Sequence, residues 1–152
     1  MHCLADAITE ASGLPLLHIA EPTGQALRAR GVGRVGLLGT RFTMEQPFYR
    51  AYLEDHFGLA VLTPDSGARG AVHAVIYQEL VRGVLREESR LVLADAVAAL
   101  AAEGAEAVIL GCTELGLLLK DGDGAVPLVD TTQLHADAAA ALALDDNQEA
   151  GK

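Results

Sequence analysis

Short apolar runs alternate with helical stretches along almost the whole chain, and this alternation limits the folds open to it. Runs rich in aliphatic and β-branched residues have the length of buried strands and lie at 14–19, 34–38, 59–62, 107–110 and 126–129. Stretches of helical character separate them. Strands that alternate with helices typically form a parallel sheet covered by helices. The sequence therefore predicts an α/β fold, with a parallel sheet flanked by helices.

The intervening segments predict six helices, at 2–11, 23–30, 43–56, 71–85, 87–103 and 131–144, and a loop over 64–70. Thr43 is expected to cap the third of these helices, because Gln46 three residues later completes a capping-box pattern. Thr131 or Thr132 is expected to cap the last one. A chain of 152 residues has room for one such α/β domain.

The bulk composition narrows the classes of function. A formal net charge of −10 argues against nucleic acid as a partner, and mildly against an anionic substrate unless a few arginines gather at its site. No apolar run reaches the length of a membrane span and no cleavable signal is visible, so no membrane partner is expected. The only cysteines, Cys3 and Cys112, favour a reducing compartment, and so the cytoplasm, over a disulfide framework.

The sequence carries no recognisable pattern for a metal or a phosphate. Its five histidines are scattered, without a His-x-x-x-His or Cys-x-x-Cys pair. Gly31, Gly33 and Gly36 imitate part of a glycine fingerprint, but they precede or enter a strand instead of leaving one. No cofactor is therefore expected.

The octapeptide Ala-Val-Ile-Leu-Gly-Cys-Thr-Glu at 107–114 is the strongest chemical signal. It places Cys112 in a strand-to-helix turn, and Thr113 and Glu114 then begin a short helical run to Leu119. The free N–H groups at the start of a helix would lower the pKa of the thiol and favour a reactive thiolate. The alternative is that Cys112 is only a small buried hydrophobic residue.

Polar or reactive residues follow three of the predicted strands, as Gly39-Thr40, Gly111-Cys112-Thr113 and Asp130-Thr131-Thr132. In an open parallel sheet these strand ends lie along one edge, where ligands bind. Backbone N–H groups and threonine hydroxyls at helix N-termini suit a carboxylate. The alternative for the threonines, above all Thr43 and Thr132, is plain helix capping.

Three motifs resemble those of the aspartate/glutamate racemase family. They are Leu-Leu-Gly-Thr-Arg-Phe-Thr-Met-Glu at 37–45 with Phe48-Tyr49, Val-Ile-Leu-Gly-Cys-Thr-Glu at 108–114, and Val-Asp-Thr-Thr-Gln-Leu-His-Ala at 129–136. Their order and spacing fit the family across essentially the whole chain, and the three together are far more specific than any one.

The resemblance implies an amino-acid racemase, an isomerase that works without pyridoxal phosphate. Family members consist of two similar α/β domains with the active site between them, where a thiolate removes the Cα proton and an acid returns a proton to the opposite face. Cys112 matches the second catalytic cysteine of the family. Thr113 and Thr40 match contacts to the substrate carboxylate.

The chain departs from the family pattern at its start. The first catalytic residue of the family belongs to a motif of the type Cys/Thr-Asn-Thr-Met-His, and Met1-His2 resembles the tail of that motif. The resemblance thus implies an N-terminally truncated member, with 1–31 as a remnant of the first domain, 32–130 as the second domain, and 131–152 as a terminal helix returning to the first domain plus a frayed tail. Cys3 does not align with the missing residue, although it could replace it.

Basic residues could recognise a side-chain carboxylate of the substrate. Arg82 and Arg86, near the end of the helix predicted from 71, are expected on one helix face because of their i, i+4 spacing, and Arg41 directly follows the Leu-Gly-Thr loop. The alternative is solvated arginines, or pairing with Glu79 or Glu87. Glu114 is expected near the Cys112 thiol, and His135 is interpreted as a core histidine with its hydrogen bonds satisfied.

The sequence leaves three hypotheses for function. The first is racemisation of aspartate, glutamate or a broad range of amino acids, impaired because one acid/base group is absent. The second is decarboxylation of a malonate-type substrate, or a related isomerisation, by a single cysteine on the same fold, and the third is a non-catalytic fragment that binds a carboxylate. Apolar residues on the terminal helices, including Leu4, Ile8, Leu134 and Leu142, also predict a homo-oligomer.

Overall fold

A four-stranded parallel sheet forms the centre of the molecule. The structure is a computed structural model that describes residues 4–120 and 122–149. The strands β1 (Arg34–Leu38), β2 (Ala60–Leu62), β3 (Ala107–Leu110) and β4 (Leu128–Asp130) lie in the order β2-β1-β3-β4. All neighbouring pairs are parallel. This confirms the predicted α/β fold with a parallel sheet.

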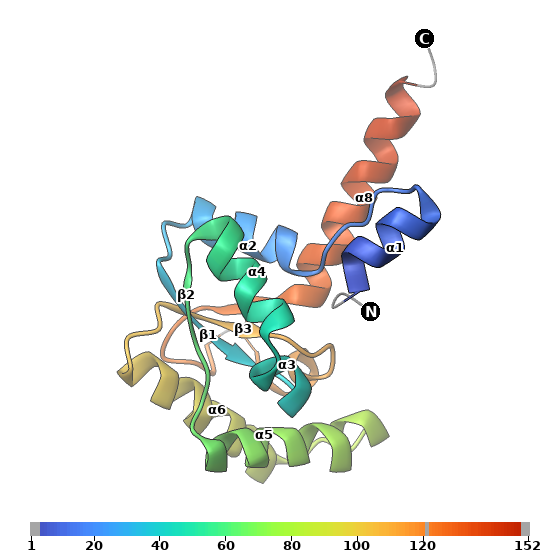
Figure 1. Ribbon diagram of the computed structural model, residues 1–152. Coiled ribbons are helices and arrows are strands. Elements are labelled where there is room, and N and C mark those ends of the chain that lie inside the picture. Colours follow the sequence, from blue (N-terminus) through green and yellow to red (C-terminus); the bar gives the residue numbers. More distant parts are fainter. Residues whose placement is uncertain (1–3, 121, 150–152) are drawn as a thin grey trace.

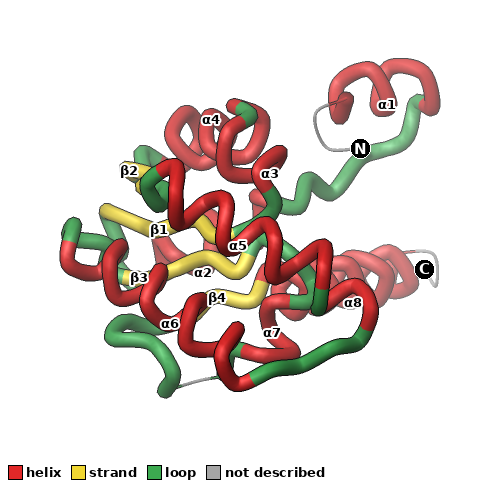
Figure 2. Tube along the Cα trace, turned by 90° about the horizontal axis from the view of Figure 1, so that it is seen from below, coloured by secondary structure: helices red, strands yellow, loops and turns green. Residues whose placement is uncertain are grey.

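Helices cover both faces of the sheet (Figure 1). On one face lie α2 (Ala20–Ala29), α4 (Pro47–Phe57) and the start of α8 (Thr131–Glu149). On the other lie α5 (Ser66–Gln78), α6 (Glu87–Ala102) and the short α7 (Leu115–Leu118), and α5 and α6 stand in front of the strands when the molecule is seen from below (Figure 2). The molecule thus has three layers.

The two central strands explain why both faces are covered. Successive side chains of a strand point to opposite faces, so Leu37 and Ile109 join the core under α2 and α4, while Leu38, Val108 and Leu110 join the core under α5 and α6. Every residue of β3 is buried. A strand buried on both faces needs the continuous apolar run that the sequence has there.

The apolar run at 14–19 is not a strand, and the prediction was wrong there. The segment is an extended link between α1 (Ala5–Ser12) and α2, outside the sheet. Pro15 has no backbone N–H to donate to a neighbouring strand, and Leu14 is largely exposed. The length and apolar content of this run predicted a strand, because neither property reflects the missing N–H of Pro15 or the exposure of Leu14.

Three predicted helix starts were also wrong. The helix expected from residue 23 begins at Ala20. Thr43 caps no helix, because Thr40 caps the short α3 (Arg41–Glu45) and Pro47 forces Gln46 into an extended conformation before α4 begins. The predicted loop over 64–70 is mostly helix, because the Asp65 carboxylate accepts the N–H groups of residues 67 and 68 and starts α5.

The α8 helix begins at Thr131 as predicted, but its capping residue differs from the prediction. Its cap is neither Thr131 nor Thr132, but the Asp130 carboxylate, which accepts the N–H groups of Thr132 (2.8 Å) and Gln133 (3.3 Å). The helix continues to Glu149, past the predicted end at 144.

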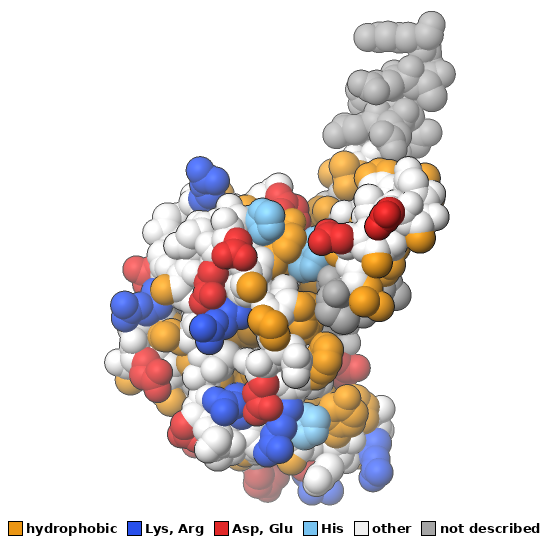
Figure 3. Space-filling model, in the orientation of Figure 1, with side chains coloured by type: hydrophobic (Ala, Val, Ile, Leu, Met, Phe, Trp, Pro, Cys, Tyr) orange, Lys and Arg blue, Asp and Glu red, His pale blue; other side chains and the backbone are white. Residues whose placement is uncertain are grey.

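The two ends of the chain are the least buried parts of the structure. The α1 helix has no buried residue, and α8 projects from the domain with Leu142 and Leu144 exposed (Figure 1). Figure 3 shows hydrophobic side chains exposed over this region. The homo-oligomer stays a prediction, as does the domain division at residue 31, although α2 already shares the core of the sheet. No helix among the described residues has the length and apolar character needed to cross a bilayer.

Candidate active site at the carboxyl ends of the strands

The ends of β1, β3 and β4 are joined by direct hydrogen bonds. The Gly111 N–H donates to the Leu38 carbonyl (2.7 Å), and the Thr131 hydroxyl donates to the Leu110 carbonyl (2.9 Å). These bonds bring the segments that carry Thr40, Cys112 and Thr131 to one edge of the sheet. The strand ends at which the sequence predicts a site therefore lie together in the folded chain, and their role in binding or catalysis stays a prediction.

Gly111 allows β1 and β3 to approach this closely. A methyl group on Gly111 would lie 2.8 Å from the Leu38 carbonyl oxygen and 3.3 Å from Thr43 Cγ2. The threonine is thus packed against the turn that carries the thiol. Thr43 thus lies beside this turn and is not the helix cap that the sequence suggested, while its contact with substrate stays a prediction.

The Cys112 thiol is half-buried and packs against the core under α5 and α6. Its Sγ–H donates to Glu114 Oε2 (2.9 Å), and the Thr113 hydroxyl donates to the same oxygen (2.6 Å). Burial, followed by the hydrogen bond to this carboxylate, raises the pKa of Cys112 to about 12. The two donated bonds lower the pKa of Glu114 from its ordinary value. At neutral pH the pair is therefore a thiol beside a carboxylate.

The thiolate expected from the sequence is not supported by this environment. The helix after Cys112 has only four residues and starts at Leu115, three residues beyond the thiol. Its dipole is correspondingly weak at the sulfur. The negative charge of Glu114 and the loss of solvent outweigh it, so the pKa moves up instead of down.

The Thr40 turn forms the other side of the strand junction. Thr40 Oγ1 accepts the Thr43 N–H (3.3 Å), and the two hydroxyls lie 3.2 Å apart. Arg41 is the first residue of α3, and its backbone N–H donates to Nδ1 of His73 on α5 (3.3 Å). The structure thus places two hydroxyls and a cationic side chain at the edge that holds the thiol.

Comparison with known proteins agrees with this geometry. A model of the Asp/Glu/hydantoin racemase family matches residues 1–139. The chain belongs to the Asp/Glu/hydantoin racemase family. A candidate Asp/Glu racemase from Yersinia pestis is 48% identical and superimposes with a TM-score of 0.91, over 95% of this chain and 63% of that one.

Two further solved structures extend the comparison. An aspartate racemase homologue from Pyrococcus horikoshii is 33% identical with a TM-score of 0.84, over 93% of this chain and 62% of that one. The aspartate racemase of Picrophilus torridus, 19% identical with a TM-score of 0.61 over 81% of this chain and 51% of that one, shares the fold. The present racemase-family chain thus spans less than two thirds of the length of each.

Arg82 stands apart from the strand junction in this family member. It ends the short helix η2 (Leu80–Arg82), and Gly83 follows with a positive φ of 71°. Arg86 lies beyond that turn and pairs with Glu79 (3.7 Å). The two arginines therefore do not share a helix face, and that prediction was wrong. Arg82 is exposed, and the described contacts do not join it to the thiol.

His135 has a hydrogen-bond contact, as the sequence suggested, but it is half-buried and lies outside both core clusters. Its Nε2 lies 3.1 Å from the Leu17 carbonyl, so it ties α8 to the segment before α2. The contact of His73 with the Arg41 turn was not predicted, and Asp130 was predicted at the sheet edge but not as the cap of α8. An Asp before a predicted helix is a recognisable capping signal, whereas no local pattern marks His73.

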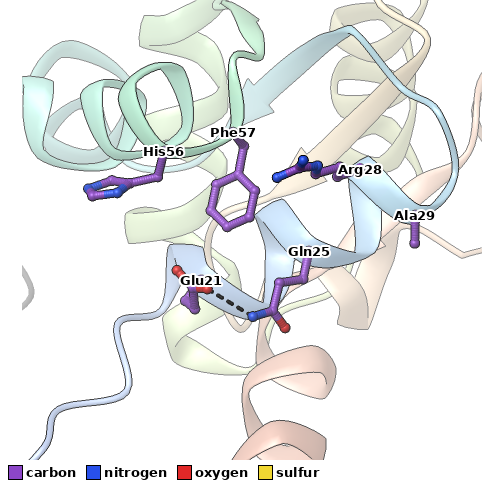
Figure 4. Close-up of a pocket in the computed structure, with 6 residues that line it drawn as sticks. All are labelled: Glu21, Gln25, Arg28, Ala29, His56 and Phe57. Carbon is purple, nitrogen blue, oxygen red and sulfur yellow. Dashed lines mark hydrogen bonds between the residues drawn. The ribbon is translucent and has the colours of Figure 1, made fainter.

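The structure also has a hollow between α2 and α4 (Figure 4). The residues that line it are far from Cys112 in the sequence. The hollow has a volume of about 540 Å³, and its lining includes Gln25, Arg28, His56 and Phe57. None of these residues follows a strand end, so we do not include this hollow in the site. Among the described residues, no group of three or more His, Cys, Asp or Glu side chains could hold a metal ion.

The Glu114 carboxylate makes the reactivity of the thiol testable. In Glu114→Gln the negative charge is lost, so the pKa of Cys112 should fall, while burial keeps it above the ordinary thiol value. Because the thiolate is the reacting form, alkylation of Cys112 by iodoacetamide at fixed alkaline pH should be faster in this variant than in the unmodified chain. Peptide mass spectrometry gives the rate at Cys112 alone. Glu88→Gln, on the exposed start of α6, is the matched control, and equal rates in all three proteins would mean that Glu114 does not control the thiol.

Proposed function

We propose that Cys112 transfers a proton at the Cα atom of an acidic or broad-range amino acid, as part of a cofactor-independent racemase-type reaction. The observation that carries this proposal is the Cys112 thiol at the end of β3, hydrogen-bonded to Glu114 beside the Thr40 turn. A protonated thiol is the acid half of a two-base reaction, because it can deliver a proton to a carbanion on its own side.

The neighbouring groups have distinct roles in this proposal. The hydroxyls of Thr40, Thr43 and Thr113 and the backbone N–H groups at this edge receive the substrate α-carboxylate. Arg41 receives a side-chain carboxylate. Arg82 has no role in this proposal, because it stands apart from the strand junction. Glu114 accepts the hydrogen bond from the Cys112 thiol and thereby helps to set its protonation state.

One observation favours a second function on the same fold. The raised pKa of Cys112 keeps the thiol protonated, and a protonated thiol alone suffices for decarboxylation of a malonate-type substrate. Carbon dioxide leaves with cleavage of the C–C bond, the electron pair stays as an enediolate, and the thiol proton goes to that carbon. Water then returns a proton to the sulfur.

Deuterium exchange at Cα tests the first function. Residues 1–152 are incubated in D₂O with L-aspartate and with D-aspartate separately, and loss of the Cα proton is followed by NMR. We expect exchange in only one enantiomer, because Cys112 approaches Cα from one side, and its rate should rise with pH as the thiolate fraction rises.

Inversion should be negligible in the same samples. It requires a second acid/base group on the opposite face. The family motif that carries this group matches the chain only at Met1-His2, outside the described residues. Inversion as fast as exchange, measured by chiral chromatography, would contradict this account. Release of carbon dioxide from an aryl malonate without exchange of aspartate would favour the second function.

A further inference from the structure

The N-terminal turn of α3 is held from outside by the longer helix α5. We propose that His73 on α5 is a positioning residue that fixes the Thr40–Arg41 turn and thereby gives the site its selectivity for a side-chain carboxylate. The inference rests on the proposed function and extends it to a residue that does not itself contact the reacting atoms.

The backbone of α3 needs such an anchor. It has only five residues, too few for an isolated helix to be stable in water. Its first N–H groups have no partner within the helix. Thr40 satisfies the Thr43 N–H, and His73 Nδ1 satisfies the Arg41 N–H at 3.3 Å. The imidazole therefore supplies a bond that the short helix cannot make for itself.

The Arg41 side chain lies against the same face of α5. A methyl group on Gly70 would be 3.2 Å from Arg41 Nη2, so the guanidinium lies directly over this glycine. Gly70, His73 and Tyr77 are spaced three and four residues apart and share one helix face. The His73 and Tyr77 rings are in contact, with centroids 4.6 Å apart. Tyr77 thus supports the imidazole, and Gly70 leaves room for the guanidinium.

The contact between His73 and Arg41 lies at the same edge of the sheet as Cys112. The α5 helix starts directly after β2, and α3 directly after β1, so both begin at the carboxyl edge where Cys112 lies. Among the described residues, Arg41 forms no ion pair with an acidic side chain, whereas Arg69 beside it pairs with Glu45 (3.2 Å). Arg41 is therefore the cation at this turn that a substrate carboxylate can engage.

The position of the acceptor atom gives a sharp test. The side-chain oxygen of asparagine lies near the place of Nδ1 in histidine, whereas that of glutamine lies near the place of Nε2. His73→Asn should keep the bond to the Arg41 N–H, and His73→Gln and His73→Leu should lose it. NMR hydrogen exchange of the Arg41 amide reads out this bond directly.

We expect the Arg41 amide to exchange several-fold faster in His73→Gln and His73→Leu than in the unmodified chain or His73→Asn. By calorimetry, the Kd for L-aspartate should rise about fivefold in the same two variants, as for one lost hydrogen bond. The Kd for L-alanine, which has no side-chain carboxylate, should change by less than about twofold. Glu45→Gln is the control, because it cuts the link to Arg69 at the other end of α3 and should leave both readouts unchanged.

The outcomes separate the two proposals. If His73→Asn behaves like His73→Leu in amide exchange, or if alanine and aspartate weaken equally, the positioning role is wrong. If the amide pattern is as expected but the unmodified chain binds neither amino acid, His73 still fixes the turn, whereas its role in selectivity and the proposed function are both overturned.

Discussion

Replacing Cys112 with serine should slow Cα exchange of aspartate at least about a hundredfold, the usual scale for loss of a general acid or base. A serine hydroxyl fits the same half-buried position beside Glu114 but does not ionise in the accessible pH range. Binding of aspartate should change little, because the proposed contacts to its carboxylates come from other residues. NMR exchange rates and calorimetry on the same samples measure the two effects.

Cys3→Ser is the matched control for this variant. Cys3 lies outside the described residues, and from the sequence it was one candidate for the first acid/base group of the family. We expect its replacement to leave exchange unchanged. A loss of exchange in Cys3→Ser comparable to that in Cys112→Ser would show that the chemistry needs both thiols.

Gly111→Ala should damage stability and exchange together. Its new methyl group would lie 2.8 Å from the Leu38 carbonyl oxygen, which is held by the pairing of β1 with β3 and cannot move aside cheaply. Overpacking of this kind costs about 1–3 kcal/mol of the free energy of unfolding. A shift of the turn by about 1 Å can also cost a hundredfold in rate, because Cys112 is the next residue.

Gly33→Ala separates crowding at the junction from a general effect of removing glycine. Gly33 lies just before β1, and a methyl group there would meet only the Glu106 carboxylate at 3.8 Å. Urea unfolding and the exchange assay should give nearly unchanged values for this variant. If Gly111→Ala were equally mild, the strand junction would be looser than the hydrogen bond from Gly111 to Leu38 indicates.

The sheet could be predicted from the sequence because its signal is local. The bounds predicted for β1 match the structure, and so do those of β3, since both strands are short, largely apolar runs buried on two faces, apart from the exposed Arg34 at the start of β1. Helix starts were harder to predict. They depend on which nearby side chain accepts hydrogen bonds from the free N–H groups at the helix start. Asp65 caps α5 where a loop was predicted, and Asp130 caps α8 where a threonine cap was predicted.

For the candidate site, likewise, some features could be predicted from the sequence and others could not. The gathering of Thr40, Cys112 and Thr131 follows from strand direction, which the apolar pattern already determines. The protonation of Cys112 does not, because it depends on the depth of burial and on which way the Glu114 carboxylate turns. The link from His73 to Arg41 joins residues 32 positions apart, on two helices that only the folded chain brings into contact.

The strand order has a consequence for how such a fold can change its chemistry. From β1 the chain turns outward to β2 by way of α4 on one face, and from β3 it turns outward to β4 through α7 on the other. The connections therefore diverge at this point, and in open α/β sheets this is the position where ligands bind regardless of which side chains lie there. Under the proposed function, topology sets the position of the site, and a few residues in two turns determine the reaction. Racemisation and decarboxylation could thus be exchanged during evolution by substitutions in those turns, without any change to the sheet.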